Sequence, residues 1–173
     1  MKTKILFLSL VTILSAFLFP GCKKKKVDCS NYVNDQILHA VYIKLVDKQT
    51  GADLITTKGI TAEQIKITKE ETTEQIRADH WMINTRVPGN PYDGTLQLMV
   101  FPLEEPEQVR KITFGNLGTF TLSYKMTKVV NTDPSPCGPG YYYSLSDVKI
   151  KDHEYENMKI QDTVHPYFLI IKI

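Results

Sequence analysis

The chain has 173 residues, a length that suits one domain rather than two. Its formal net charge is +2, but this sign comes from the lysines near the N-terminus: residues 27–173 contain 15 basic and 19 acidic side chains. An acidic domain repels a polyanion, so this composition argues against nucleic-acid binding.

The first 21 residues are typical of a secretory signal. Lys2 and Lys4 precede an apolar run at 5–19, which is too short to cross a bilayer core comfortably as a helix. We therefore expect residues 1–21 to be removed and exclude them from the fold.

The end of this segment, LFPGC at 18–22, resembles a bacterial lipobox, in which a small residue precedes a cysteine directly after the apolar run. Phe19 departs from the leucine that is usual three positions before the cysteine. The resemblance implies that Cys22 is lipidated and becomes the mature N-terminus. Several acyl chains would then anchor the protein far more firmly than one chain. An ordinary signal peptide with an incidental cysteine is the alternative.

Residues 22–36 are predicted to form the lipidated N-terminus and a polar tether. The lysines at 23–26 would lie at the headgroup layer, where each adds about 1 kcal/mol of attraction to anionic lipid.

Two cysteines remain once Cys22 is assigned to lipid. Cys29 and Cys137 form an even pair in an oxidising compartment. A disulfide between them would close most of the domain into one loop, which is worth roughly 4–5 kcal/mol in the chain-entropy model. Two free thiols are the alternative, because the sequence does not set the distance between them.

No metal or cofactor is expected. The chain has no CxxC or HxxxH spacing, and its histidines are scattered at His39, His80, His153 and His165.

From residue 41 onward, short alternating runs are separated by turns that contain Gly or Pro, which predicts strands. In the clearest run, 119–130, Phe120, Leu122 and Tyr124 share one face. Thr121 and Ser123 occupy the other, as in a half-buried strand with one wet face. In chain order the predicted strands are 41–46, 52–56, 64–68, 75–85, 95–101, 109–114, 119–130, 141–150 and 164–173.

This pattern predicts an all-β domain at 37–173: a two-sheet antiparallel sandwich of about seven to nine strands. A barrel is the main rival. The apolar run at 168–173 must be central or covered, since an exposed strand of this kind invites edge pairing.

Residues 41–55, VYIKLVDKQTGADLI, and 60–67, ITAEQIKI, resemble the opening of small lipoproteins found widely in Bacteroidetes. Their first strand ends in a D-K-x-T-G turn, and a D/E-x-I-x-I segment follows. Residues 122–125 and 143–150 extend the likeness. The resemblance implies an immunoglobulin-like or transthyretin-like sandwich in the cell envelope, and it implies no reaction.

The same resemblance bears on location and modification. Surface-exported members of that group tend to carry acidic residues after the lipidated cysteine, whereas this chain has lysines there. This difference favours the periplasmic face of the outer membrane. The group also glycosylates Asp-Thr/Ser-apolar sites, which makes Thr163 in DTV at 162–164 a candidate. An ordinary strand-entry threonine is the alternative.

The candidate ligand-binding residues are aromatic. Trp81 and Tyr142 are candidates for stacking on a sugar ring, although packing within the fold is the simpler explanation. Tyr141 and Tyr143 face opposite to Tyr142 in a strand, so the three cannot form one flat platform.

No common hydrolase, metalloprotease, P-loop or dinucleotide-binding motif occurs. The sequence therefore predicts a non-enzymatic, membrane-anchored lipoprotein whose sandwich is a structural or protein-interaction module. Its expected partners are the membrane, through Cys22, and an envelope protein. A carbohydrate-binding accessory lipoprotein of a polysaccharide-uptake system is the alternative, with a glycan as its ligand. An enzyme of unrecognised type has no motif in its support.

Overall fold

The computed structural model describes residues 38–70, 72–85, 89–103, 105–132, 137–138 and 140–173, all of which belong to one compact unit, residues 34–173. Nine strands are formed within these ranges: β1 (His39–Val46), β2 (Ile65–Lys69), β3 (Trp81–Asn84), β4 (Thr95–Val100), β5 (Glu107–Phe114), β6 (Thr119–Val130), β7 (Tyr141–Ile150), β8 (Tyr155–Ile160) and β9 (Thr163–Lys172). The helical elements are one turn each: α2 (Leu54–Thr57), η1 (Ala62–Gln64) and η2 (Ala78–His80).

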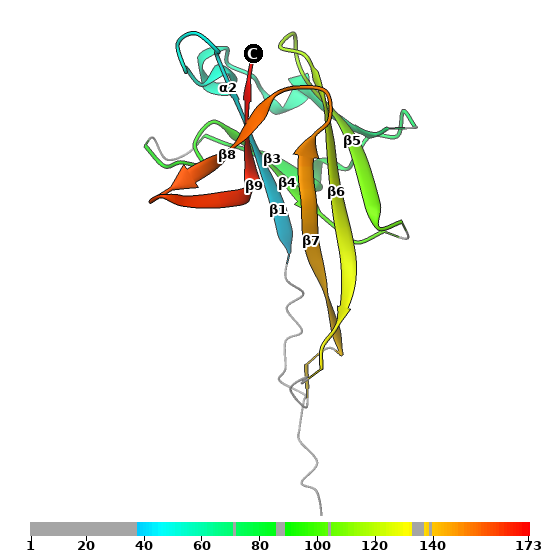
Figure 1. Ribbon diagram of the computed structural model, residues 1–173. Helices are drawn as coiled ribbons and strands as arrows, with labels where there is room; N and C mark the ends of the chain where they lie inside the picture. Colours follow the sequence, from blue (N-terminus) through cyan, green and yellow to red (C-terminus); the bar gives the residue numbers. More distant parts are fainter. Residues whose placement is uncertain (1–37, 71, 86–88, 104, 133–136, 139) are drawn as a thin grey trace, which may run out of the picture. The chain divides into compact units, whose positions relative to one another are not determined.

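The predicted all-β, two-sheet class is confirmed. A five-stranded sheet has the order β3-β4-β1-β9-β8, and a four-stranded sheet has the order β2-β5-β6-β7 (Figure 1). The core lies between them and is built from the alternate residues of each strand, such as Ile43 and Leu98 from the first sheet and Ile112 and Leu122 from the second. None of the described helices is long and apolar enough to span a bilayer.

The main difference from the expected antiparallel sandwich lies at the chain ends, because β1 and β9 pair in parallel. Their register runs from Tyr42 opposite Phe168 to Val46 opposite Lys172. Beyond the strands, the Ile173 N–H donates to the Val46 carbonyl at 3.0 Å. This pairing places β9 between β1 and β8, so the C-terminal run is central, as predicted.

Two segments differ from their predicted structure. Residues 52–56 were expected as a strand but lead into α2, because Asp53 Oδ1 accepts hydrogen bonds from the N–H groups of Ile55 and Thr56 and so caps a helical turn. In the range 75–85, η2 occupies 78–80 and only Trp81–Asn84 is a strand.

One strand, β8, was not predicted at all. Its pairing with β9 is irregular between Asn157 and Lys159, where Pro166 of β9 has no N–H to donate. The side-chain amide of Asn157 instead donates to the carbonyls of His165 and Pro166. At the tip, Gln161 and Asp162 both have positive φ, as a tight two-residue hairpin turn requires.

The polar face of β6, which was expected to be exposed to solvent, is buried over part of its length. Thr121 is 8% exposed and Ser123 only 1%. Thr121 is covered because the Asp152 carboxylate accepts hydrogen bonds from its N–H at 3.0 Å and from its hydroxyl at 2.7 Å. Burial raises the pKa of Asp152, but these hydrogen bonds and one from His153 outweigh it, so the pKa lies below its usual value.

We expect Leu169→Ala to lower the free energy of unfolding by about 2–5 kcal/mol, because Leu169 is fully buried in the central strand β9. The matched control is Val164→Ala in the same strand, where the side chain is 51% exposed and the change should stay within about 0.5 kcal/mol. Denaturant unfolding followed by circular dichroism measures both. Equal effects of the two substitutions, or normal folding of a chain that lacks residues 167–173, would show that β9 is not central.

Candidate functional site

A hollow opens beside the beginning of β5. It has two lobes with volumes of about 210 and 550 Å³, and both are lined by Lys69, Leu103 and Arg110. The smaller lobe is otherwise mainly apolar, with Ile76 and Phe101 among its lining residues. We call this feature the Arg110 hollow.

Arg110 reaches the hollow because β5 alternates. Gln108 and Arg110 lie on the same side of this strand as the core residues Ile112 and Phe114, and all four are buried. Arg110 itself is only 6% exposed. Buried arginine is rare unless an acid pairs with it, so its partners decide what the site can do.

The hydrogen bonds of Arg110 are all to neutral groups. Its Nη1 donates to the Val109 carbonyl at 2.9 Å, and its Nη2 donates to Gln108 Oε1 at 3.0 Å. Within the part of the chain that the structure describes, the buried Nε has no hydrogen-bond partner. Gln108 is held in turn, because its side-chain amide donates to the Glu105 carbonyl. The guanidinium is therefore fixed in place with donors unused.

The positive charge of the Arg110 guanidinium is not balanced by a carboxylate of the described residues. No carboxylate of the described residues lies within 4.0 Å of the guanidinium. Two of the acids that line the hollow have other partners: Glu74 pairs with Lys69 at 2.9 Å, and Glu107 pairs with Lys151 at 3.7 Å.

Tyr124 does not supply the missing negative charge either. The guanidinium carbon of Arg110 lies 5.8 Å from the centroid of its ring, a cation–π contact. Burial raises the pKa of the Tyr124 phenol, and the nearby Arg110 charge only partly opposes this shift. The phenol is therefore neutral near pH 7.

A second exposed feature is the far part of the β6–β7 hairpin. Residues 126–130 of β6 pair with 141–145 of β7 and lie beyond the part of β6 that pairs with β5 (Figure 1). We call these two segments the tyrosine ribbon. Val130 is 70% exposed, Tyr142 46% and Tyr141 38%. The Tyr141 ring packs edge-on against Tyr143, as expected for residues on one face of a strand.

The tyrosine ribbon lies beside the beginning of β1, where the predicted tether joins the domain. The His39 ring nitrogen Nε2 lies 2.8 Å from the Tyr143 carbonyl oxygen. Leu38, directly before β1, is 61% exposed. Several of the exposed large apolar side chains thus lie toward the end of the domain where β1 begins.

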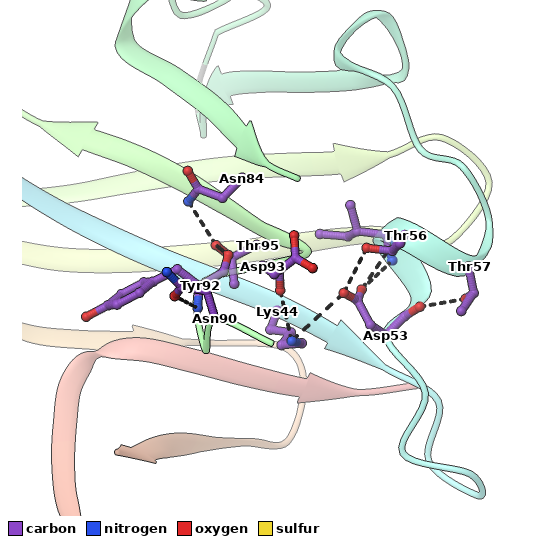
Figure 2. Close-up of polar contacts among 10 residues, drawn as sticks. Lys44, Asp53, Thr56, Thr57, Asn84, Asn90, Tyr92, Asp93 and Thr95 are labelled. Carbon is purple, nitrogen blue, oxygen red and sulfur yellow. Dashed lines mark hydrogen bonds and ion pairs between the residues drawn. The ribbon is translucent and has the colours of Figure 1, made fainter. Parts of the chain in front are cut away.

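A polar cluster on the outer face of the first sheet is structural. Figure 2 shows Lys44 of β1 between Asp53 and Asp93. Its Nζ donates to the Asp93 carbonyl at 2.9 Å and lies 3.9 Å from Asp53 Oδ2. Asp53 Oδ2 also accepts from the Thr56 hydroxyl at 3.0 Å. Both Asp53 oxygens are therefore used in holding α2 and the loop before β4 against β1.

The same loop places an aromatic ring over the sheet. Tyr92 packs against Tyr42 of β1 and Phe168 of β9, with ring centroids 4.7 and 5.4 Å apart. The Thr95 hydroxyl donates to the Tyr92 carbonyl at 2.6 Å and accepts from the Asn84 amide at 3.0 Å (Figure 2). These contacts explain why Phe168 is buried on the face that points away from the core.

The predicted site residues lie apart in the fold. Trp81 is 8% exposed and belongs to the core, so little of its ring is offered to a ligand. Tyr142 is exposed on the tyrosine ribbon, and Thr163 is exposed directly after the tight turn between β8 and β9. Ligand binding and glycosylation at these positions stay predictions.

The cysteine predictions reach beyond the described ranges. Cys22 and Cys29 lie outside them, whereas Cys137 is described and half-buried. Lipidation of Cys22 and the disulfide between Cys29 and Cys137 therefore stay predictions. Within the described ranges, His, Cys, Asp and Glu do not gather into a group of three or more that could hold a metal ion.

The comparisons with known proteins add no relative. No protein-family model, no curated protein and no solved structure matches the chain.

Sequence reasoning did not single out Arg110. The sequence nevertheless places Arg110 on the inward face of the predicted strand 109–114. Every second residue of a strand points the same way, and Arg110 lies two residues before Ile112 and four before Phe114. A cation at an inward position of a strand is unusual, and this is the signal that the sequence offered.

Gly94→Ala should lower the free energy of unfolding by at least about 1 kcal/mol more than Gly59→Ala does. This difference is the typical contribution of a helix cap, here the cap of α2 by Asp53. Both glycines have a similar positive φ, 67° and 60°, so the backbone strain is matched. A Cβ at Gly94 would lie 1.4 Å from Asp53 Oδ2, whereas Gly59 has nothing within 4 Å. Thermal and denaturant unfolding measure the difference. Equal destabilisation would mean that Asp53 does not need its observed position.

Proposed function

We propose that this chain is a lipid-anchored envelope protein, held at the periplasmic face of the outer membrane through Cys22. Its sandwich then acts as a non-enzymatic structural or protein-interaction module. The observation that carries this proposal is the leader, in which an apolar run ends in LFPGC and four lysines follow. A thiol at this position would lie at the membrane surface, where a lipid group can be attached.

The tyrosine ribbon is the surface on which a protein partner would bind. It lies beside the beginning of β1 and carries exposed aromatic and apolar side chains. Tyrosine has an apolar ring and a polar tip, which suits a wet interface. Val130, Tyr141 and Tyr142 would therefore contact the partner.

In the producing cell, the Cys22→Ser variant should leave the membrane fraction, whereas the unsubstituted protein should remain there after a high-salt wash. The wash matters because the lysines at 23–26 alone would bind anionic lipid only electrostatically. Cys29→Ser is the matched control and should stay with the membrane. Mass spectrometry of the mature protein supplies the second readout, and an unmodified Cys22 would overturn the proposal.

A carbohydrate-binding accessory lipoprotein of a polysaccharide-uptake system is the second candidate, and the exposure of Tyr142 favours it. An exposed ring at the end of a hairpin can stack on the apolar face of a sugar. Trp81 offers less support, because it lies in the core.

If the protein binds a glycan, Tyr142→Ala should weaken that binding by about three- to tenfold, the worth of one aromatic contact. A glycan array finds the ligand, and titration calorimetry measures the loss. Trp81→Phe serves as the control, because substitution of a buried ring should change the unfolding temperature and leave the affinity unchanged. An array on which nothing binds would rule out this candidate and leave the interaction module.

A further inference from the structure

We propose that the Arg110 hollow binds an organic carboxylate that carries an apolar group. The inference rests on the described domain alone and does not depend on the lipid anchor. Its starting point is energetic: a charge removed from water without a counter-charge destabilises the folded state. Arg110 is in that position, because it is 6% exposed and its hydrogen-bond partners among the described residues are all neutral.

The geometry of Arg110 suits a carboxylate. A guanidinium presents its donors in a rigid plane that matches the two oxygens of a carboxylate. Val109 and Gln108 each take one donor and hold the plane still, and further N–H groups of Nη1 and Nη2 are left unused. A ligand would therefore meet a donor pair that is already oriented.

The walls of the hollow indicate the rest of the ligand. Beside the guanidinium lie the apolar side chains of Ile76, Phe101 and Leu103 and the ring of Tyr124. Leu103 is 48% exposed, which leaves apolar surface for a ligand to cover. A small acid with an aromatic or branched apolar body fits this combination.

The other charges around the hollow limit the ligand to a single negative charge. Cations are present at Lys69 and Arg77, and acids at Glu70, Glu74, Glu105 and Glu107. The rim as a whole is thus not basic, and its acids would repel a polyanion such as a phosphorylated or polyuronic ligand. Among the described residues that line the hollow, Arg110 is a buried cation for which no acidic partner is found within 4.0 Å.

The test uses 3-phenylpropionate, with its uncharged amide and acetate as comparison probes, and the full-length chain in a neutral detergent. We expect the chain to bind the acid at least about tenfold more tightly than the amide. One charge-assisted hydrogen-bonded pair between the Arg110 guanidinium and the carboxylate would account for that difference in affinity. Acetate should bind weakly, because it has no apolar body to cover the walls. Calorimetric titration gives the three affinities.

Substitutions at Arg110 separate a binding role from a structural one. Arg110→Met should abolish the preference for the acid and, at the same time, raise the unfolding temperature of the ligand-free protein, because methionine fills the space without a buried charge. Arg110→Lys should keep the charge, lose the planar donor pair and bind the acid more weakly than the unsubstituted chain. Lys172→Met removes an exposed cation that does not line the hollow, so it is the control and should leave the affinity within about twofold.

Three results would overturn the proposal. The first is equal affinity of the unsubstituted chain for the acid and the amide. The second is an Arg110→Met chain that still prefers the acid. The third is no binding of any probe together with a lower unfolding temperature for Arg110→Met, which would assign Arg110 a structural role.

Discussion

The parallel pairing of β1 with β9 is the constraint on which the rest of the domain depends. It joins the first and last strands of the described chain, and both are flanked on either side by other strands of the same sheet. The five-stranded sheet therefore cannot be completed until residues 163–172 are available. Pairing between segments so distant in sequence has a high entropic cost and forms slowly.

The same pairing separates the two ends of the domain. Because the strands are parallel, the C-terminal Ile173 lies beside Val46 and Lys48, at the end of β1 away from His39 (Figure 1). The beginning of β1 and the tyrosine ribbon share the His39 end. The Arg110 hollow depends on the other sheet, through the alternation of β5.

The sequence predicted the strands that alternate regularly, such as β6 and β7, because a two-residue period is a local property. It did not predict β8, whose pairing with β9 is interrupted near Pro166. There the Asn157 side-chain amide donates hydrogen bonds to the carbonyls of β9 in place of a backbone N–H. The predicted strand 52–56 instead leads into α2, because the Asp53 side chain caps a helical turn there. The Arg110 hollow could be inferred only in part: alternation points Arg110 inward, but the lack of a carboxylate near it among the described residues is a three-dimensional property.

Hydrogen exchange of the backbone amides tests the central claim, the closure of the sheet by β1 and β9, most directly. If this pairing holds the domain together, the amides of Ile43, Leu45, Leu169 and Ile171 should exchange only when the whole domain unfolds, with the same free energy as denaturant unfolding. The amides of the tyrosine ribbon should exchange faster, by local opening of a two-stranded segment. Exchange of the β9 amides at a free energy well below that of global unfolding, while β5 and β6 stay protected, would contradict the account.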